Sequence, residues 1–358
     1  ESLWWSSKEH NQILLLLMEQ EILQNTYNKK FHNALNKVEQ KVPPIWLMRQ
    51  AGRYHKHYRT LKEKYSFEQL CKEPELACEV TLGPIAEFDF DAAILFSDIL
   101  FPLDYLGMGL KFKPGPIFER NLNSKMISEF NIDEFESFME FQSKSLNLIR
   151  NELPNDKSLI GFTGGPFTLY HFAIRNNPVS EKLFQQTLPI LEELIHKNIQ
   201  IQFQSDIDLL MIFDTEANNL NDEEFDKLVI PFIKKIADSY PNKIGYFTKG
   251  ISQSKLNKLQ RLENLKLTVL GSNLEIFSEL PKTHLSLQGN FSNNLLAMED
   301  SKAFSNIIDE YLEKCMQIDV SHRSGWIASL DHGVKKTTPE ANVHLFIEKI
   351  RTKLSQKS

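Results

Sequence analysis

Short apolar runs alternate with longer segments of helical character from residue 43 onward, and this alternation limits the possible folds more than any other feature. An apolar run of about four to eight residues between polar or glycine-containing segments is typical of a buried strand. The runs are 45–48, 93–96, 159–162, 209–213, 243–247, 267–270, 284–287 and 326–330. The segments with helical character include 74–88, 180–204, 222–239, 301–316 and 339–354.

Eight strands that alternate with helices predict an α/β fold: a single (β/α)8 TIM-type barrel with its active site at the C-terminal ends of the strands. The alternative is an open doubly wound sheet, but no Gly-x-Gly-x-x-Gly turn follows the first apolar run. The chain has 358 residues, and one barrel can occupy most of that length. No repeat, low-complexity tract or Gly/Ser-rich linker divides it. We therefore predict one domain over residues 31–358.

Residues 1–30 are predicted to form an N-terminal extension, to which we assign no role. Their apolar run at 13–18 is far shorter than the about 20 residues that a membrane-spanning helix needs. Glu9 and His10 precede this run in place of a basic stretch, so we expect neither a secretory signal nor insertion into a membrane. An amphipathic helix that packs on the rest of the chain or on a partner is one possible structure for this segment.

Polar segments, several of them containing glycine, follow most of the predicted strands, at the ends where a barrel carries its active site. They are 49–53, 97–98, 163–166, 214–216, 288–290 and 331–333. Asp98 follows a strongly apolar run and could stabilise a developing cation, or it could cap the next helix. His332 could donate to an anion or move a proton, or its own loop could hold it. Thr215 offers a hydroxyl, and the turn at 164–166 either admits a ligand or simply begins a helix.

Arg49 and Arg53 lie four residues apart around Gly52. On a helix this spacing would place both guanidinium groups on one face, whereas a loop could direct both to one ligand. Each guanidinium group matches the geometry of a carboxylate. Two surface arginines in an ordinary loop would give the same pattern. Their position after the first predicted strand favours a site that binds carboxylates.

The net charge of −6 argues against general affinity for nucleic acid or anionic membranes, so no such partner is expected. The three cysteines, Cys71, Cys78 and Cys315, lack the spacing of metal ligands and indicate a reducing compartment. Cys71 and Cys78 are seven residues apart on an expected helix, but two thiolates do not complete a zinc site. We predict no metal site, and we expect most of the 25 phenylalanines to lie in the core.

Several blocks of the sequence closely resemble the uroporphyrinogen decarboxylase family. The most specific are 43–54, with the arginine pair, and 92–100, which reads Ala-Ala-Ile-Leu-Phe-Ser-Asp-Ile-Leu. Segments 161–169 and 288–290, and His332-Gly333 followed by Thr338-Pro339, match in the same order. The resemblance extends from about residue 31 to residue 353.

The resemblance implies a (β/α)8 barrel that forms a homodimer with facing clefts, resides in the cytoplasm and uses no metal or organic cofactor. It implies a carbon–carbon lyase that removes carbon dioxide from the four acetate side chains of uroporphyrinogen III. The product is coproporphyrinogen III, an intermediate of haem and other tetrapyrrole synthesis. An electron-rich pyrrole protonated on a ring carbon can itself accept the electrons that decarboxylation leaves behind.

The resemblance also implies roles for particular residues of this chain. Arg49 and Arg53 would bind substrate carboxylates, and one of them would be a candidate proton donor. Asp98 would bind the pyrrole N–H groups and stabilise the cationic intermediate. The remaining predicted substrate contacts are Gln50, Ala51, Gly52, Phe172, Thr215 and His332.

The sequence departs from the family pattern at several positions, which leaves two other functions open. Phe172 stands where the family has tyrosine, Thr215 where it has serine, and Asn218 where it has glycine. Ser272-Asn273 replaces an Asp-Trp pair. The alternatives are a cobalamin-related methyltransferase of the same superfamily, which would need a zinc site, and a tetrapyrrole-binding protein without turnover.

Overall fold

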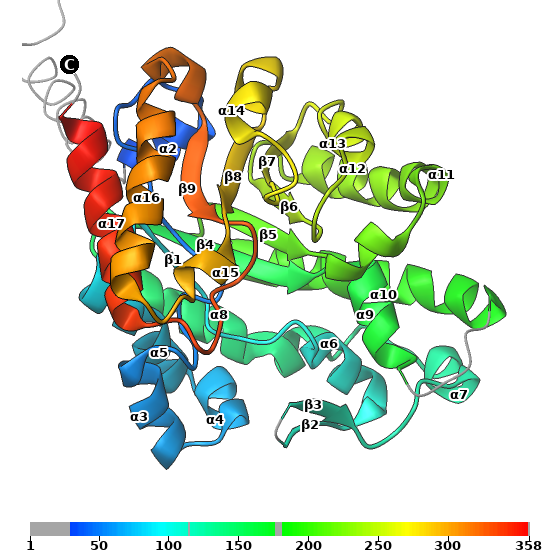
Figure 1. Ribbon diagram of the computed structural model, residues 1–358. Helices are drawn as coiled ribbons and strands as arrows, with labels where there is room; N and C mark the ends of the chain where they lie inside the picture. The colour runs from blue at the N-terminus through cyan, green and yellow to red at the C-terminus, as the bar shows by residue number, and fades with distance from the viewer. Residues whose placement is uncertain (1–28, 114, 176–180, 357–358) are drawn as a thin grey trace, which may run out of the picture.

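The computed structural model describes residues 29–356, except 114 and 176–180, and it is organised around one parallel sheet of seven strands. The sheet is curled, with helices packed around it (Figure 1). In spatial order its strands are β1 (Ala92–Ile94), β4 (Ser158–Gly164), β5 (Leu209–Phe213), β6 (Ile244–Phe247), β7 (Leu265–Val269), β8 (Ser286–Phe291) and β9 (Trp326–Leu330). Neighbouring strands are consecutive members of this sheet along the chain, which is the order expected when each pair is joined by a helical crossover.

Seven of the predicted strands are confirmed, but the predicted strand at 45–48 is wrong. Ile45 forms only an isolated parallel bridge with Ala328 of β9. The preceding residues Pro43 and Pro44 have no N–H group, so they cannot donate to a ladder. The N–H of Ile45 donates to the Asp91 side chain at 2.8 Å instead of to a neighbouring backbone. The prediction of an eight-stranded barrel is therefore confirmed only as a curled, seven-stranded parallel α/β sheet.

The segment around Ile45 nevertheless bonds to both edges of the sheet. The N–H of Ala328, in β9, donates to the carbonyl of Pro44 at 2.9 Å. The N–H of Asp91, which directly precedes β1, donates to the carbonyl of Ile45 at 2.8 Å. The chain before the arginine pair is thus fixed between the first and last strands.

The helices confirm most of the sequence prediction. The two segments 74–88 and 301–316 are helices with the predicted bounds. The segment 222–239 is divided into three short helical pieces instead of one. The α-helices of the described chain are α2 (Lys29–Leu35), α3 (Lys56–Lys64), α4 (Phe67–Lys72), α5 (Pro74–Phe88), α6 (Phe101–Leu103), α7 (Ser124–Ser128), α8 (Phe135–Glu152), α9 (Pro166–Ala173), α10 (Glu181–Phe203), α11 (Asp222–Glu224), α12 (Ile230–Ser239), α13 (Gln253–Leu259), α14 (Ile276–Glu279), α15 (Asn293–Leu296), α16 (Ser301–Met316) and α17 (Glu340–Ser355). Short 3-10 or π segments are η1 (Asp104–Met108), η2 (Thr215–Asn219), η3 (Phe225–Val229), η4 (Leu280–Lys282) and η5 (Val320–Arg323).

Two of these helix boundaries have clear local causes. Helix α4 begins with a capping box in which the Ser66 hydroxyl accepts from the Gln69 N–H and the Gln69 side chain accepts from the Ser66 N–H. Helix α5 begins at Pro74, whose missing N–H costs nothing in a first turn. This boundary separates Cys71 on α4 from Cys78 on α5, so the prediction that the two share a helix is wrong. All three cysteines are buried free thiols.

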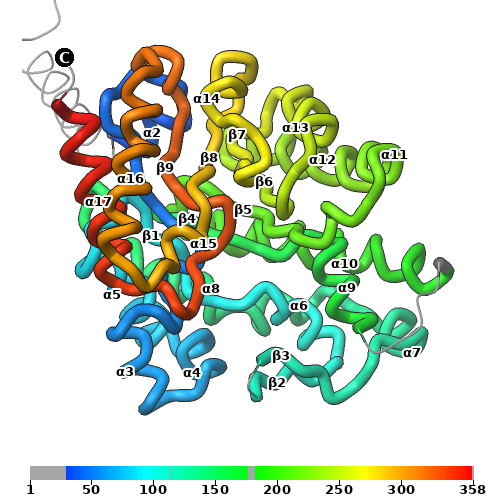
Figure 2. The backbone as a smooth tube through the Cα atoms, in the orientation of Figure 1, coloured from blue at the N-terminus to red at the C-terminus, as the bar shows by residue number. Residues whose placement is uncertain are grey.

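A small antiparallel hairpin, β2 (Leu110–Phe112) with β3 (Pro116–Phe118), lies apart from the main sheet at the bottom of Figure 1. Far segments of the chain also meet: α2, at the start of the described chain, lies beside β9 (Figure 2). The hydroxyl of Ser286 at the start of β8 donates to the Ala34 carbonyl of α2 at 2.8 Å. Within the described residues, no helix combines the length and apolar character needed to cross a membrane.

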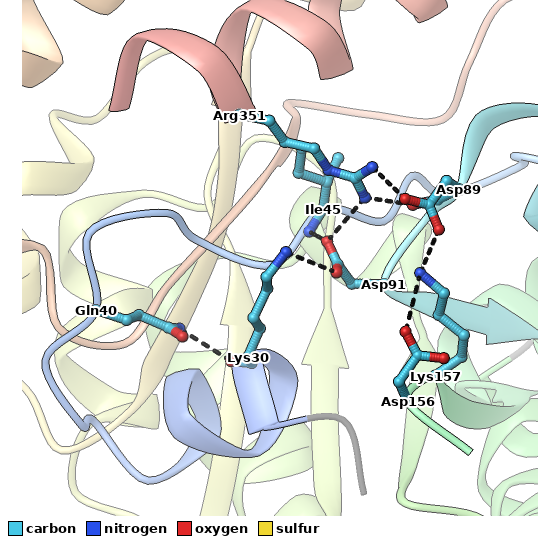
Figure 3. A network of polar contacts seen from close by, with 8 residues as sticks. All are labelled: Lys30, Gln40, Ile45, Asp89, Asp91, Asp156, Lys157 and Arg351. Atoms are coloured by element: carbon cyan, nitrogen blue, oxygen red, sulfur yellow. Dashed lines mark hydrogen bonds and ion pairs between the residues drawn. The ribbon is translucent and has the colours of Figure 1, made fainter. Parts of the chain in front are cut away.

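A polar network at the amino end of β1 ties both ends of the described chain to the sheet (Figure 3). The Asp91 carboxylate accepts from the N–H of Ile45 and lies 3.6 Å from both Lys30 of α2 and Arg351 of α17. Arg351 also forms an ion pair with Asp89. Because this network lies at the edge opposite the carboxyl ends of the strands, we expect it to contribute to stability, not to chemistry.

Candidate active site

The loop that carries the arginine pair is shaped by Gln50, whose side chain is buried and fully used inside the protein. Its amide oxygen accepts from the Leu47 N–H at 3.3 Å, and its amide nitrogen donates to the Ala92 carbonyl in β1 at 3.0 Å. The Tyr54 hydroxyl donates to the Gln50 carbonyl at 2.7 Å. Gln50 therefore supports the loop from the protein side and holds it against β1.

Arg49 adopts a backbone conformation that is unusual for a residue with a side chain. Its φ is +62°, in the left-handed region, which costs energy for an arginine and tends to occur at functional sites. The N–H of Val334 donates to the carbonyl of Met48 at 2.9 Å and so fixes the residue before it. The Arg49 side chain then packs on Gly333: a Cβ at Gly333 would lie 2.7 Å from Arg49 Cδ. The loop after β9 thus forms one side of the space that Arg49 occupies.

The positive charge of Arg53 acts on the guanidinium group of Arg49. The pKa of Arg49 is lowered by burial and then by the charge of Arg53, and it is partly restored by the charge of Asp98. Residue Arg49 is exposed to solvent and can reach a ligand. Among the described residues, neither Arg49 nor Arg53 forms an ion pair. Two unpaired arginines this close together are suited to an anionic ligand.

Asp98 lies where the chain has left the sheet after β1. One carboxylate oxygen accepts from the Leu100 N–H at 2.8 Å. Burial raises the pKa of Asp98 to about 6, against the opposing effects of the Leu100 N–H and of Arg49. Leu100, not Asp98, occupies the N-cap position of α6, so the Asp98 side chain is not simply a helix cap. At neutral pH the group is mostly an anion, held in a poorly hydrated place beside a cation.

After Ile94 the chain leaves the sheet. The side chain of Gln202 then makes the hydrogen bonds to β4 that a neighbouring strand would make. β1 pairs with β4 only up to Ile94, opposite Ile160. Beyond this point the Gln202 amide takes the place of the missing neighbour: it accepts from the Phe162 N–H at 2.9 Å and donates to the Phe162 carbonyl at 2.8 Å. Gly161 makes room for it, since a Cβ there would lie 2.5 Å from Gln202 Oε1.

The same amide is connected to the segment that carries Asp98. Gln202 Nε2 lies 3.4 Å from Gln142 Oε1, and Gln142 Nε2 donates to the hydroxyl of Ser97 at 3.0 Å. Both glutamines are at most 1% exposed. Buried polar groups that are satisfied in this way specify one local arrangement. The network therefore positions Ser97, and with it Asp98, relative to β4.

His332 is held as a neutral donor. Its Nδ1 accepts from the Gly333 N–H at 2.7 Å, so the ring proton must be on Nε2. Its pKa is lowered to about 4 by burial and by the charges of Arg49 and Lys249, with a smaller opposing effect from Asp331. His332 is thus held by its own loop, as one sequence interpretation had it, and it still offers an Nε2–H to a ligand.

A row of aromatic rings crosses the carboxyl ends of the middle strands and ends at His332. The ring centroids of Phe162 and Phe213 are 5.6 Å apart, those of Phe213 and Phe247 6.0 Å, and those of Phe247 and His332 5.6 Å. Phe162 and Phe247 are buried in the core and Phe213 packs against it, as expected for most of the phenylalanines. Phe213 and Phe247 are also the last residues of β5 and β6, so the same row reaches the carboxyl ends of these strands.

The turn between β4 and α9 is a structural one. Asp214, fully buried after β5, accepts from the Thr168 N–H at 2.8 Å in the first turn of α9. Burial raises its pKa to about 7. Gly165 leaves no space for a ligand, because a Cβ there would lie 2.3 Å from the Asp214 side chain. The turn at 164–166 therefore serves to begin α9.

The other predicted residues lie around this centre. Thr215 is half-buried and begins η2, directly after β5. Phe172, on α9, is also half-buried, with the Arg175 guanidinium 6.0 Å from its ring centroid. Ala51 packs on a small second core, and Gly52 is tightly placed beside the Arg49 carbonyl. Among the described residues, neither Thr215 nor Phe172 makes a hydrogen bond, ion pair or ring contact with Arg49, Arg53, Asp98 or His332.

These features define a class: an α/β protein with a parallel sheet, whose carboxyl edge carries unpaired cations, a half-buried carboxylate and aromatic rings. A family model described as uroporphyrinogen decarboxylase (URO-D) matches residues 26–353. The chain belongs to the uroporphyrinogen decarboxylase family.

Individual relatives agree with this assignment. The chain is 33% identical over 344 residues to a uroporphyrinogen decarboxylase of Orientia tsutsugamushi (strain Ikeda), which covers 90% of this chain and 98% of that protein. It is 32% identical over 332 residues to a uroporphyrinogen decarboxylase of Neorickettsia sennetsu, covering 86% of this chain and 97% of that protein. Among solved structures, a methyltransferase from Methanosarcina mazei superposes with a TM-score of 0.72 at 14% identity, over 91% of this chain and 98% of that one. At this identity the likeness shows the fold alone.

Proposed function

We propose that this protein removes the four acetate carboxyl groups of uroporphyrinogen III as carbon dioxide, giving coproporphyrinogen III in tetrapyrrole synthesis. The observation that carries the proposal is the cluster of Arg49, Arg53, Asp98 and His332 at the carboxyl edge of the sheet. Two unpaired guanidinium groups suit a substrate with many carboxylates, and one poorly hydrated carboxylate suits a cationic intermediate. Family membership supports the same reaction.

The proposed chemistry begins with a proton added to a carbon of the pyrrole ring. The protonated ring is cationic and accepts the electron pair of the bond between the acetate methylene and its carboxylate, which leaves as carbon dioxide. A second proton completes the methyl group, and the first is lost from the ring, so one proton is consumed for each carboxylate. The ring itself holds the electrons, so the proposed reaction uses no metal or organic cofactor.

Asp98 is the group that we propose to stabilise this cation and to accept from the pyrrole N–H groups. One carboxylate oxygen accepts from the Leu100 N–H, and the other accepts no hydrogen bond from the described residues. A carboxylate already desolvated in the free protein interacts more strongly with a nearby cation than one in water does. The aromatic row that ends at His332 matches the apolar face of a tetrapyrrole.

Arg49 and Arg53 are proposed to bind substrate carboxylates. Arg49 is the better candidate for the proton donor, because burial and Arg53 lower its pKa. His332 would donate its Nε2–H to a carboxylate. Thr215 and Phe172 would contact the substrate periphery, and Gln50, Ala51 and Gly52 would form the loop that presents the arginines.

We also propose several features of the whole molecule. The segment around Ile45 would close the curled seven-stranded sheet into a (β/α)8 barrel through its hydrogen bonds to both edges. Residues 31–358 would form this single domain, with residues 1–30 as an extension. The protein would act as a homodimer in the cytoplasm.

The test is to incubate the purified protein anaerobically with uroporphyrinogen III and to separate the products by their number of carboxyl groups. We expect porphyrinogens with seven, six, five and finally four carboxylates. If uroporphyrinogen binds measurably and no product with fewer carboxylates forms, the decarboxylase proposal fails and a binding protein without turnover takes its place.

A further inference from the structure

Lys249 lies at the same edge of the sheet as the candidate site and has no role in the function proposed above. It follows β6 (Ile244–Phe247) by two residues, and its side chain is exposed. The neighbouring residue Phe247 contacts the His332 ring at 5.6 Å in an edge-on arrangement. Lys249 therefore follows a strand whose last residue, Phe247, contacts His332 in the loop after β9.

The charge of Lys249 reaches the centre of the site. Together with Arg49, it helps to hold down the pKa of His332. Arg49 approaches His332 from the loop before α3, and Lys249 approaches from β6, on another part of the sheet. The neutral histidine thus lies within the field of two cations from separate elements.

No acidic group compensates the charge of Lys249 within the described part of the chain. Lys255, six residues further on, has partners inside the protein: its ammonium group donates to the Asn218 carbonyl at 2.7 Å and lies 5.3 Å from the Phe225 ring centroid. The acid next to His332, Asp331, already accepts from the Asn293 N–H at 2.9 Å. In a chain with a net charge of −6, an unpaired cation beside other unpaired cations indicates a place for an anion.

The turn that carries Lys249 is held in place by its neighbours. Gly250 has a φ of +60°, and a Cβ at Gly271 would lie 3.3 Å from Gly250 Cα. The Asn273 side chain donates to the Ile251 carbonyl at 3.0 Å. Asn273 is one of the positions at which the sequence departs from the family pattern. In this chain it fixes the turn after β6.

We propose that Lys249, from the turn after β6, binds a carboxylate of the substrate beside His332. The inference rests on the proposed function, because it takes the ligand to be a tetrapyrrole with many carboxylates. His332 then donates its Nε2–H to a carboxylate that Lys249 or Arg49 also binds, or to a neighbouring one. Lys249 is a binding residue in this account and takes no part in proton transfer.

The experiment compares Lys249→Gln with Lys249→Arg, which keeps the charge, and with Lys243→Gln as a matched control. Lys243 directly precedes β6, at the opposite end of the same strand. With uroporphyrinogen III we expect the KM of Lys249→Gln to rise about fivefold to tenfold and kcat to stay within about twofold. Lys249→Arg should stay near the wild type, and Lys243→Gln should not change KM. An unchanged KM in Lys249→Gln overturns the proposal.

A second readout needs no turnover. The His332 ring titrated by NMR in the ligand-free protein should show a higher pKa in Lys249→Gln, because a neighbouring cation has been removed. Binding of uroporphyrin, the stable oxidised form with eight carboxylates, should weaken in the same variant. If the wild-type protein binds uroporphyrin but does not decarboxylate uroporphyrinogen, the proposed function fails while the role of Lys249 is still tested by this binding. Equal affinity of the wild type and Lys249→Gln for uroporphyrin overturns that role.

Binding of the product identifies which carboxylate is bound. If Lys249→Gln weakens binding of coproporphyrinogen as much as binding of uroporphyrinogen, the lysine contacts a carboxylate that the product retains. If only the binding of uroporphyrinogen is weakened, it contacts one of the acetates. Either result supports a contact with a substrate carboxylate.

Discussion

Gly333 lies directly against the side chain of Arg49, so closely that a Cβ at residue 333 would be 2.7 Å from Arg49 Cδ and 3.0 Å from Cγ. The glycine comes from the loop after β9 and the arginine from the loop before α3. The position of the guanidinium group therefore depends on the absence of a side chain almost three hundred residues further along the chain.

Substitution Gly333→Ala should displace Arg49 and reduce kcat/KM at least about tenfold, because small misplacements of a catalytic group cost much of its effect. The Arg49 side chain can move, so we expect the free energy of unfolding to change by less than about 1 kcal/mol. Steady-state kinetics and denaturant unfolding measure the two quantities. Gly115→Ala is the control, because a Cβ at Gly115 would meet no atom within 4 Å. Equal kcat/KM in both variants would show that the contact has no functional role.

Asp98→Asn should make the ligand-free protein more stable at neutral pH. The folded state raises the pKa of Asp98 from 3.8 to about 6, so ionisation of this group disfavours folding. That cost is absent below about pH 4 and is fully present above about pH 6. We expect the variant to gain about 2 kcal/mol in the free energy of unfolding at pH 7.5, and almost nothing at pH 4. Urea unfolding at the two pH values measures the gain, and a loss of stability at pH 7.5 would contradict the assigned desolvation.

Gln202→Leu should destabilise the protein and also disturb the site. Both polar groups of the Phe162 backbone would lose their partner in a buried place, which costs about 2–4 kcal/mol in total. Because Gln202 also contacts Gln142, which bonds to Ser97, we expect kcat to fall at temperatures where the variant is still folded. Circular dichroism and kinetics below the unfolding transition separate the two effects. Gln204→Leu, at an exposed position just after α10, should change neither.

Asp91→Ala should reduce stability without changing the chemistry. It leaves the N–H of Ile45 without its partner and removes the ion pairs with Lys30 and Arg351. The exposed part of these ion pairs contributes little, so most of an expected loss of about 2–3 kcal/mol comes from the buried hydrogen bond. The KM should stay at the wild-type value in the folded protein. The control is Asp156→Ala, since Asp156 has a largely exposed side chain; a KM that rises only in Asp91→Ala would contradict a purely structural role.

The sequence predicts those parts of the fold that depend on local pattern. Apolar runs mark seven strands correctly, and the helices at 74–88 and 301–316 have the predicted bounds. The run at 45–48 has the same composition as a strand, but its ladder fails because two prolines precede it and because Asp91, distant in sequence, accepts its first N–H group. The hydrogen bonds of the Gln202 side chain to the Phe162 backbone likewise join residues 40 positions apart, which a local sequence pattern cannot predict.

Much of the candidate site can also be predicted, because a single rule places polar residues at the carboxyl ends of strands. That rule points to Asp98 after β1 and to His332 after β9. It does not place Arg49, because the run at 45–48 that precedes it is not a strand. It applies equally to Lys249, which follows β6. The contact of Gly333 with Arg49 and the tautomer of His332 require coordinates, since both are set by distances between separate loops.

Turnover of uroporphyrinogen III by Asp98→Ala tests the central claim most directly. The variant should still bind uroporphyrin, because Arg49, Arg53 and His332 remain. Its kcat should fall at least about a thousandfold, since the group that stabilises the cationic intermediate is lost. In the wild type, kcat should also decrease as the pH falls below about 6, where Asp98 becomes protonated. Near-normal turnover by Asp98→Ala under anaerobic conditions would contradict the account.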